Sequence, residues 1–295
     1  MKFIRIFCSL AIMLSGFALK TQAQIFYKVE IPDSDKPSYI LGTHHFAPIS
    51  VIDSIAQLHD ILKSVDRLYG ELDMQKMLDP SVMMEMQSLM VAPPDSTLDK
   101  LLTPAQLDSV ASVWNEYAGG TMPFEMLKGV KPALISTQLA SLITMKFLPE
   151  IDPLEGIDMT MQNRAREAGI PVEGLETIDF QINLLYGTPI EYQAASLLRL
   201  VRGIGDEEQK VRQLTEDYLA GNIDGILKEM LDSDGDEPEI AKRLIFNRNR
   251  DWVDKLVKIM PRESVMVVVG AGHLPGDRGV LEGLKNAGFL ITPIR

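Results

Sequence analysis

The chain of 295 residues contains a single cysteine, Cys8, near its amino terminus. Beyond that position there is no thiol to form a disulfide, to bind a metal through sulfur or to act as a nucleophile. Two common hydrolase motifs are also missing, since neither HExxH nor GxSxG occurs in the sequence. These motifs mark the helix of many zinc proteases and the serine nucleophile of many esterases. Any hydrolytic site must therefore be built from other groups, and stability must come from packing.

The first 23 residues have the three-part layout of a secretory signal. They begin with Lys2 and Arg5, continue with an apolar run from Ile6 to Leu19, and close on small and polar residues. The apolar run is too short to span a bilayer comfortably. We expect residues 1–23 to be a signal peptide cleaved near Ala23, which sends the chain to a periplasm or out of the cell. A retained amino-terminal anchor is the alternative.

Basic residues are scarce in the rest of the chain. Loss of the signal would remove Lys2, Arg5 and Lys20 but no acidic residue, leaving 26 of the 29 basic residues against 41 acidic ones, a net charge of −15. Such a chain repels nucleic acid and anionic lipid heads, and no basic stripe opposes that tendency. We expect no nucleic-acid partner and no membrane span in the mature form.

Strand patterns lie near both ends of the mature chain, with a long helical stretch between them. Strands are predicted at 25–31, 37–43, 66–74, 170–176, 264–273 and 289–294. Helices are predicted at 51–65, over most of 80–147 and 178–260, and at 277–288. The run VMVVV lacks polar alternation, which is typical of a sheet covered on both faces. We predict one α/β domain over 24–295, with a central, mainly parallel sheet flanked by helices. A large helical insertion is expected at roughly 78–260, interrupted by the short strand near 170–176.

Two segments share one pattern, an apolar strand followed by Gly, two residues and His. They are YILGTHH, with Gly42 and His45, and VVVGAGH, with Gly270 and His273. Residues just past the carboxyl ends of parallel strands line the ligand crevice of such sheets. Glycine lets the backbone turn sharply and approach a partner closely. If the two strands are neighbours, both imidazoles reach one site; simple polar capping of two loops is the alternative.

A third strand end adds carboxylates, Glu71 and Asp73. Two imidazoles and one carboxylate form a common ligand set for Zn²⁺, Mn²⁺, Fe²⁺ or Co²⁺, with positions left open for water and substrate. We therefore predict a metal site of His45, Glu71 and His273. A surface carboxylate paired to a basic side chain is the alternative for Glu71. We expect His44 to point away from His45 and to support the site.

Further motifs extend the pattern over the whole mature chain: ELD, LEGID, GLET, an Arg-Asn pair before Trp, and the terminal GAGHLPGDRGVLEGLKNAGF. With the two Gly-x-x-His elements, they resemble the TraB/GumN family over roughly residues 25–295. That family is related to the Tiki proteins and, more distantly, to erythromycin esterases and ChaN-like haem binders.

The resemblance implies that His45, His273 and Glu71 are active-site residues, with Glu71 as ligand or general base. It also implies a role for Arg248, whose guanidinium suits orienting a carboxylate or stabilising an oxyanion. The positions expected to support the site are Gly42, Gly270, His44, Asn249, Glu176 and Asp158.

The implied activity is that of an exported metal-dependent hydrolase, Tiki-like, acting on peptide bonds. A bound Mn²⁺, Co²⁺ or Zn²⁺ would lower the pKa of a water and polarise the scissile carbonyl. Two alternatives stay open. One is a metal-free, His-based esterase. The other is a non-catalytic protein that sequesters a peptide or haem, for which Tyr69 and the methionine-rich helices near 74–90 are candidates. We expect a peptide or a small molecule as the substrate.

Overall fold

The computed structural model describes residues 24–32, 36–120, 122–148, 156–233 and 242–294. The predicted signal peptide, residues 1–23, lies outside the described residues.

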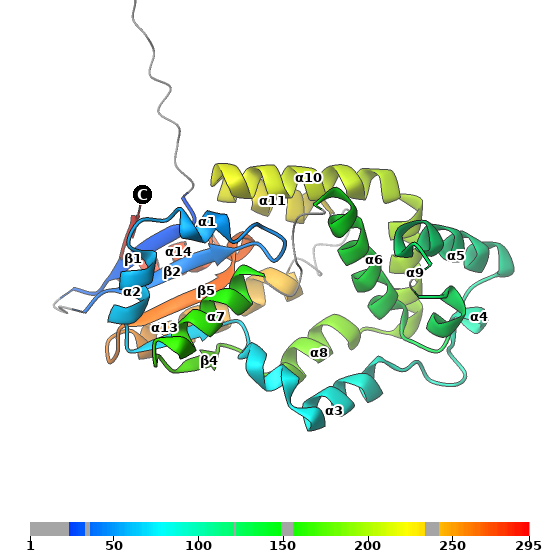
Figure 1. The fold of residues 1–295 in the computed structure, drawn as a ribbon, viewed down its shortest axis with the longest axis horizontal. Coiled ribbons are helices and arrows are strands. Elements are labelled where there is room, and N and C mark those ends of the chain that lie inside the picture. The colour runs from blue at the N-terminus through cyan, green and yellow to red at the C-terminus, as the bar shows by residue number, and fades with distance from the viewer. Residues whose placement is uncertain (1–23, 33–35, 121, 149–155, 234–241, 295) are drawn as a thin grey trace, which may run out of the picture.

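One six-stranded sheet organises the amino- and carboxyl-terminal parts of the chain (Figure 1). In the order across the sheet, its strands are β4 (Val172–Gly174), β3 (Arg67–Gly70), β5 (Val265–Gly270), β2 (Ser38–Thr43), β1 (Phe26–Glu30) and β6 (Leu290–Pro293). The first four run parallel, whereas β1 pairs antiparallel with both β2 and β6. The predicted α/β class with a mainly parallel central sheet is confirmed.

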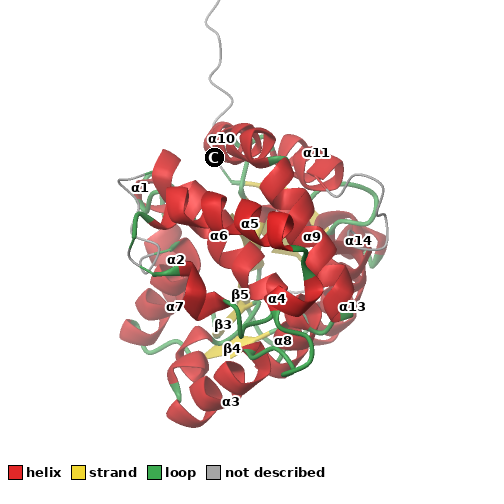
Figure 2. Ribbon diagram, turned by 90° about the vertical axis from the view of Figure 1, so that its right-hand side faces the viewer, coloured by secondary structure: helices red, strands yellow, loops and turns green. Residues whose placement is uncertain are grey.

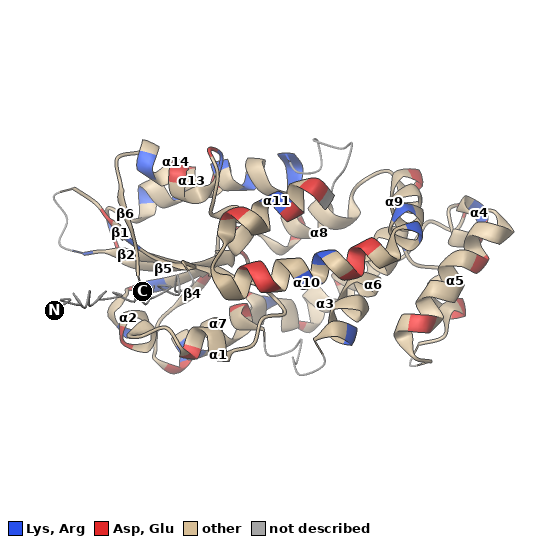
Figure 3. Ribbon diagram, turned by 90° about the horizontal axis from the view of Figure 1, so that it is seen from above, with Lys and Arg blue, Asp and Glu red and all other residues tan. Residues whose placement is uncertain are grey.

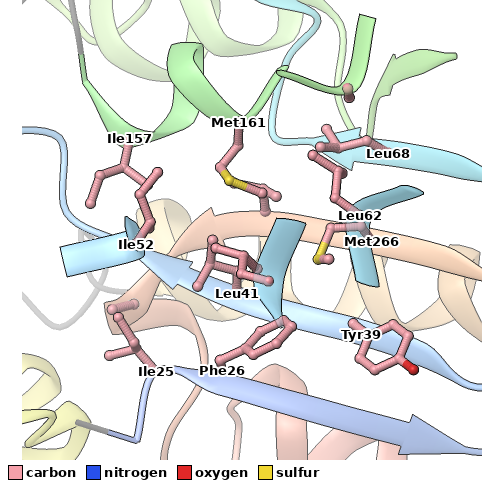
Figure 4. Packing of buried hydrophobic residues seen from close by; sticks show 14 of the residues in the cluster. Ile25, Phe26, Tyr39, Leu41, Ile52, Leu62, Leu68, Ile157, Met161 and Met266 are labelled. Carbon is pink, nitrogen blue, oxygen red and sulfur yellow. The ribbon is translucent and has the colours of Figure 1, made fainter. Parts of the chain in front are cut away.

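Helices cover both faces of this sheet (Figure 3). One face carries α1 (Ser50–Asp53), α2 (Leu58–Ser64) and α7 (Ile157–Glu167); the other carries α13 (Asn247–Ile259) and α14 (Val280–Asn286). Strand β5 supplies side chains to both sides, because Met266 and Val268 join the first apolar cluster and Val267 joins the second. Figure 4 shows Met266 in the first cluster with Leu62 and Met161. The apolar run of β5 is uninterrupted because helices cover both faces of the strand, as the sequence pattern indicates.

The remaining helices form a lobe beside the sheet (Figures 1 and 2). They are η1 (Met74–Leu78), α3 (Pro80–Met90), α4 (Leu98–Leu101), α5 (Pro104–Ala118), η2 (Phe124–Leu127), α6 (Pro132–Phe147), α8 (Ile178–Tyr186), α9 (Ile190–Arg202) and α10 (Ile204–Ala220). Helix α11 (Ile223–Ser233) instead packs Ile226 into the first apolar cluster of the sheet, and the π-turn η4 (Lys242–Phe246) precedes α13. The lobe has its own core around Trp114, Leu139 and Leu197. Helix α10 joins the two parts, because it packs Val211 against that core and Tyr218 into the sheet cluster. None of the described helices has both the length and the apolar composition needed to cross a membrane.

Two predicted strands end at least three residues earlier than the sequence pattern indicates. The strand expected at 66–74 stops at Gly70. Asp73 then accepts a hydrogen bond from the backbone N–H of Gln75 and so begins η1. The strand expected at 264–273 stops at Gly270 and continues as the single turn η5 (Ala271–His273). Both shifts place functional candidates in the loops that follow the strands.

At Gly42, β2 lies close against the segment after β5. A Cβ atom at this position would lie 2.8 Å from Cδ1 of Leu274 and 3.1 Å from Cα of Ala271. The carbonyl of Gly42 also accepts a hydrogen bond from the buried hydroxyl of Tyr218 at 3.1 Å. The glycine of the first Gly-x-x-His motif is therefore needed for close packing.

Gly42→Ala should lower the free energy of unfolding by about 1–3 kcal/mol, since the added methyl group overpacks this contact. Urea denaturation measures the change. The matched control is Gly205→Ala in α10, where a Cβ would meet nothing within 4 Å; it should leave stability unchanged or raise it by up to ~1 kcal/mol. Equal midpoints for the two variants would contradict the packing role.

Candidate functional site

The candidate residues come from the loops after three adjacent parallel strands. Strand β5 lies between β2 and β3, with Thr43 opposite Gly270 and Gly70 opposite Val268. The chain therefore leaves all three strands at the same edge of the sheet, where a crevice forms in this class of fold. The two strands that carry the Gly-x-x-His motifs are direct neighbours.

His45 is paired with a buried carboxylate at this edge. Its Nδ1 lies 3.0 Å from Oδ2 of Asp158, the second residue of α7, and the hydroxyl of Thr43 donates to Oδ1 at 2.8 Å. Asp158 raises the pKa of His45, through its charge and its hydrogen bond, to about 9. The His45 side chain is 69% exposed, and its Nε2 has no hydrogen-bond partner among the described residues. Asp158 therefore fixes the orientation of the imidazole through Nδ1 and leaves Nε2 without a partner in the described part of the chain.

Arg248 is the centre of a second, buried group. Its Nε and Nη2 donate to the two carboxylate oxygens of Glu176 at 2.8 and 2.9 Å. Nη2 also donates to Oε2 of Glu71 at 2.6 Å, and Nη1 donates to the carbonyl of Leu244 at 3.1 Å. A further bond joins Nη1 to Nε2 of His273 at 3.2 Å. All five N–H donors of the guanidinium are therefore in use. In this arrangement Arg248 orients carboxylates and has no donor left for an oxyanion.

The hydrogen bonds around His273 fix its tautomer. Asn249 donates through Nδ2 to the carbonyl of Arg278 at 2.9 Å, so its Oδ1 faces His273 as an acceptor. Nδ1 of His273, 2.6 Å from that oxygen, must carry the proton. Nε2 then has a lone pair, which accepts from Arg248. His273 is thus a neutral imidazole held at both nitrogens.

Burial and neighbouring charges decide the protonation states of the buried group. Burial lowers the pKa of His273 to about 4, against the pull of Glu71, so the ring stays neutral. Burial alone would raise the pKa of Glu71, but the charges of Arg248 and His45, with a hydrogen bond from the Gly270 N–H, hold it well below its usual range. Glu71 is therefore a carboxylate at every physiological pH.

Two contributors were not assigned from the sequence, Gln181 and Trp252. The side-chain amide of Gln181 donates to Oε2 of both Glu71 and Glu176, at 3.2 and 3.1 Å. The indole N–H of Trp252 donates to Glu176 at 2.9 Å, and its ring lies 4.7 Å from the guanidinium carbon of Arg248. Because Trp252 follows Arg248 by four residues on one helix, spacing could have indicated it. Nothing in the local sequence marks Gln181.

The other candidates have simpler surroundings. A Cβ on Gly270 would lie 3.3 Å from Oε1 of Glu71, so the glycine leaves room for that carboxylate. The ring of His44 packs beside that of Tyr218, with their centroids 5.5 Å apart, and its Nδ1 accepts from the Phe46 N–H. Burial, with the charge of His45, lowers the pKa of His44 to about 4. Asp73 pairs with Arg166 and takes no part in the site.

The predicted metal ligands do not form a ready cation site in this arrangement. Nε2 of His273 and Oε1 of Glu71 are 4.0 Å apart, but the positive guanidinium of Arg248 contacts both residues. His45 directs its Nδ1 to Asp158 instead. Within the described ranges, no group of three His, Cys, Asp or Glu side chains is placed to hold a metal ion. As arranged here, these residues do not fit a divalent cation, and metal binding stays a prediction.

The whole constellation lies within a region that matches one family model. The chain belongs to the TraB/PrgY/gumN family, whose model matches residues 25–293. The family resemblance read from the motifs is therefore confirmed over nearly the full chain. Neither a curated protein nor a solved structure matches it.

Arg248→Met should lower the free energy of unfolding by about 3–5 kcal/mol at pH 7, because Glu71 and Glu176 lose their buried counter-ion. Without the guanidinium, burial should raise the pKa of Glu71 above its unfolded value. The folded variant then binds more protons than its unfolded chain. The loss in the free energy of unfolding, relative to the unsubstituted protein, should therefore shrink as the pH falls towards 5.

Urea denaturation at pH 7 and pH 5 measures both effects. Arg250→Met is the matched control, since Arg250 lies on the same helix with a side chain that is 68% exposed. Equal losses for the two variants would contradict the central role of Arg248.

Proposed function

We propose that this protein is a hydrolase of acyl bonds, with peptide bonds as the predicted substrate class, in which His45 activates the attacking water. The observation that carries the proposal is the His45–Asp158 pair at the carboxyl edge of the sheet. One nitrogen of the imidazole is held by a buried carboxylate, and the other has no hydrogen-bond partner in the described part of the chain, on a side chain that is 69% exposed. That is the arrangement of a general base whose tautomer is fixed by a second group. Export through residues 1–23 is part of the proposal.

The proposed reaction uses His45 as a proton carrier. In its neutral form, Nε2 takes a proton from water while the water oxygen bonds to the carbonyl carbon. The imidazolium formed is stabilised by Asp158, as the raised pKa of His45 indicates. The same proton then passes to the leaving amine or alcohol as the carbon–nitrogen or carbon–oxygen bond breaks. No proton is gained or lost by the enzyme over the cycle.

The buried group supports this chemistry by fixing charge. Glu71 is the most exposed of the ionisable members, with a side chain that is 17% exposed, and it interacts electrostatically with His45. Its carboxylate favours the imidazolium form of His45 during the reaction. Arg248 holds Glu71 in place, so its substitution should reduce the rate through Glu71.

The metal-dependent form of this reaction stays a prediction from the family resemblance. Two experiments test metal dependence. The first compares the metal content of the purified protein with that of the double variant His45→Ala/His273→Ala. The second compares activity before EDTA treatment, after it, and after Mn²⁺, Co²⁺ or Zn²⁺ is added back. Retention of stoichiometric metal only by the unsubstituted chain would favour the metal-dependent form.

A non-catalytic peptide-binding function is the second candidate. It is favoured by the complete pairing of Arg248, which leaves no guanidinium donor for a transition-state charge. The haem-binding alternative has less support, because Tyr69 is buried in the sheet cluster and its hydroxyl bonds to Glu263 at 3.2 Å.

Hydrolysis should rise with pH, because only the neutral form of His45 can accept the proton and its fraction grows up to the raised pKa of about 9. Asp158→Asn should move this rise towards the ordinary histidine pKa of ~6.5 and lower the maximal rate by ~10²–10⁴-fold. His45→Gln should abolish the rise. The measurement is kcat/KM from pH 5 to 10 on peptide libraries and nitrophenyl esters.

His59→Gln is the matched histidine control, since His59 is exposed on α2, and it should change nothing. Turnover by His45→Gln with an unchanged pH profile would contradict the role of His45. Tight peptide binding with no turnover of any substrate would favour the binding protein.

A further inference from the structure

A cavity of about 620 Å³ opens beside His45, between the sheet and the helical lobe. Its size is within the range of ~300–1,000 Å³ found for small-molecule sites. On the sheet side it is lined by His45 and Phe46 after β2 and by Met159 of α7. On the lobe side it is lined by Met74 and by one face of α6. The exposed imidazole of His45 is thus part of its wall.

The face of α6 towards this cavity carries small side chains, Thr137, Ala140, Ser141 and Thr144. Three of them are hydroxyl residues, which would ordinarily offer donors to a ligand. Here each hydroxyl donates to the carbonyl four residues earlier in the same helix, at 3.0, 3.1 and 2.9 Å. Because the hydroxyl protons are already used, the wall presents methyl groups, carbon atoms and weak acceptors.

Charge is also scarce around the cavity. The ionisable side chains among its described lining residues are His45 and Asp158, and these two are paired with each other. Within the described part of the wall there is no cation to bind a substrate carboxylate or phosphate, and no second carboxylate to bind an amine. The thioethers of Met74 and Met159 and the ring of Phe46 adapt well to hydrocarbon groups.

We propose that this cavity is the specificity subsite of the enzyme, which receives an uncharged, apolar group next to the bond that His45 attacks. The group is a hydrocarbon chain, supplied either by the acyl part of an ester or by an apolar side chain of a peptide. The assignment rests on the proposed function for the position of the reacting bond. The preference for apolar groups rests on the wall alone.

Direct binding of two small probes, each confirmed intact after the measurement, separates this proposal from catalysis. Saturation-transfer NMR measures the binding of each probe. 2-Octanone represents the acyl chain, and N-acetyl-leucinamide represents the apolar peptide side chain. N-acetyl-aspartamide is the charged comparison. Ala140→Trp should fill the cavity and weaken the binding of the apolar probes by about tenfold, which is the effect of excluding two methylene groups. Gln138→Trp, at an exposed position of the same helix outside the cavity wall, should leave binding unchanged.

Ala140 is itself exposed, so both variants should fold, which circular dichroism checks. Ala140→Lys is a second variant, which should weaken the binding of the apolar probes and strengthen the binding of the acidic probe. Loss of binding by 2-octanone or by N-acetyl-leucinamide supports the subsite and identifies the source of the chain.

Equal binding of the charged probe, or equal effects of Ala140→Trp and Gln138→Trp, would overturn the subsite. Specific apolar binding without turnover of any substrate would leave the subsite standing and reject the hydrolase. Substrate turnover with a kcat/KM that Ala140→Trp leaves unchanged would support the hydrolase and reject the subsite.

Discussion

The guanidinium of Arg248, with all five of its donors in use, is the interaction on which the site depends. It joins α13 to the loop after β3, to Glu176 after β4 and to the turn after β5. A buried charge of this kind is costly unless it is fully paired, and here the pairing includes two carboxylates and the ring of Trp252. Its removal would leave negative charge buried at the edge of the sheet. The same contacts set the tautomer of His273 and the orientation of Glu71.

The two imidazoles of the Gly-x-x-His motifs have different environments, and this difference assigns them different tasks. His273 is buried, neutral and bound at both nitrogens, whereas His45 is exposed and bound at one. The rigid group therefore supplies fixed charge, and the exposed ring supplies a proton acceptor next to a cavity. The parallel strands make this possible, because they deliver both motifs and Glu71 to one edge.

Much of this arrangement could be predicted from the sequence. The apolar runs of β2 and β5, each closed by Gly-x-x-His, indicated both the sheet and the residues at its edge. The pairing could not be predicted, because it depends on elements distant in the chain. Asp158 is 113 residues from His45, and Gln181 is 110 residues from Glu71. The position of Arg248 between the expected ligands was missed for the same reason, since no local pattern states which carboxylates a buried guanidinium will find.

Nitrogen-15 NMR of the histidine rings between pH 5 and 8 tests the central claim most directly. It reports which ring nitrogens carry protons and at what pH each ring titrates. The network predicts that His273 stays neutral over this range with its proton on Nδ1, held between Asn249 and Arg248. A His273 ring that titrates near the ordinary pKa of ~6.5, or that carries its proton on Nε2, would contradict the network around Arg248.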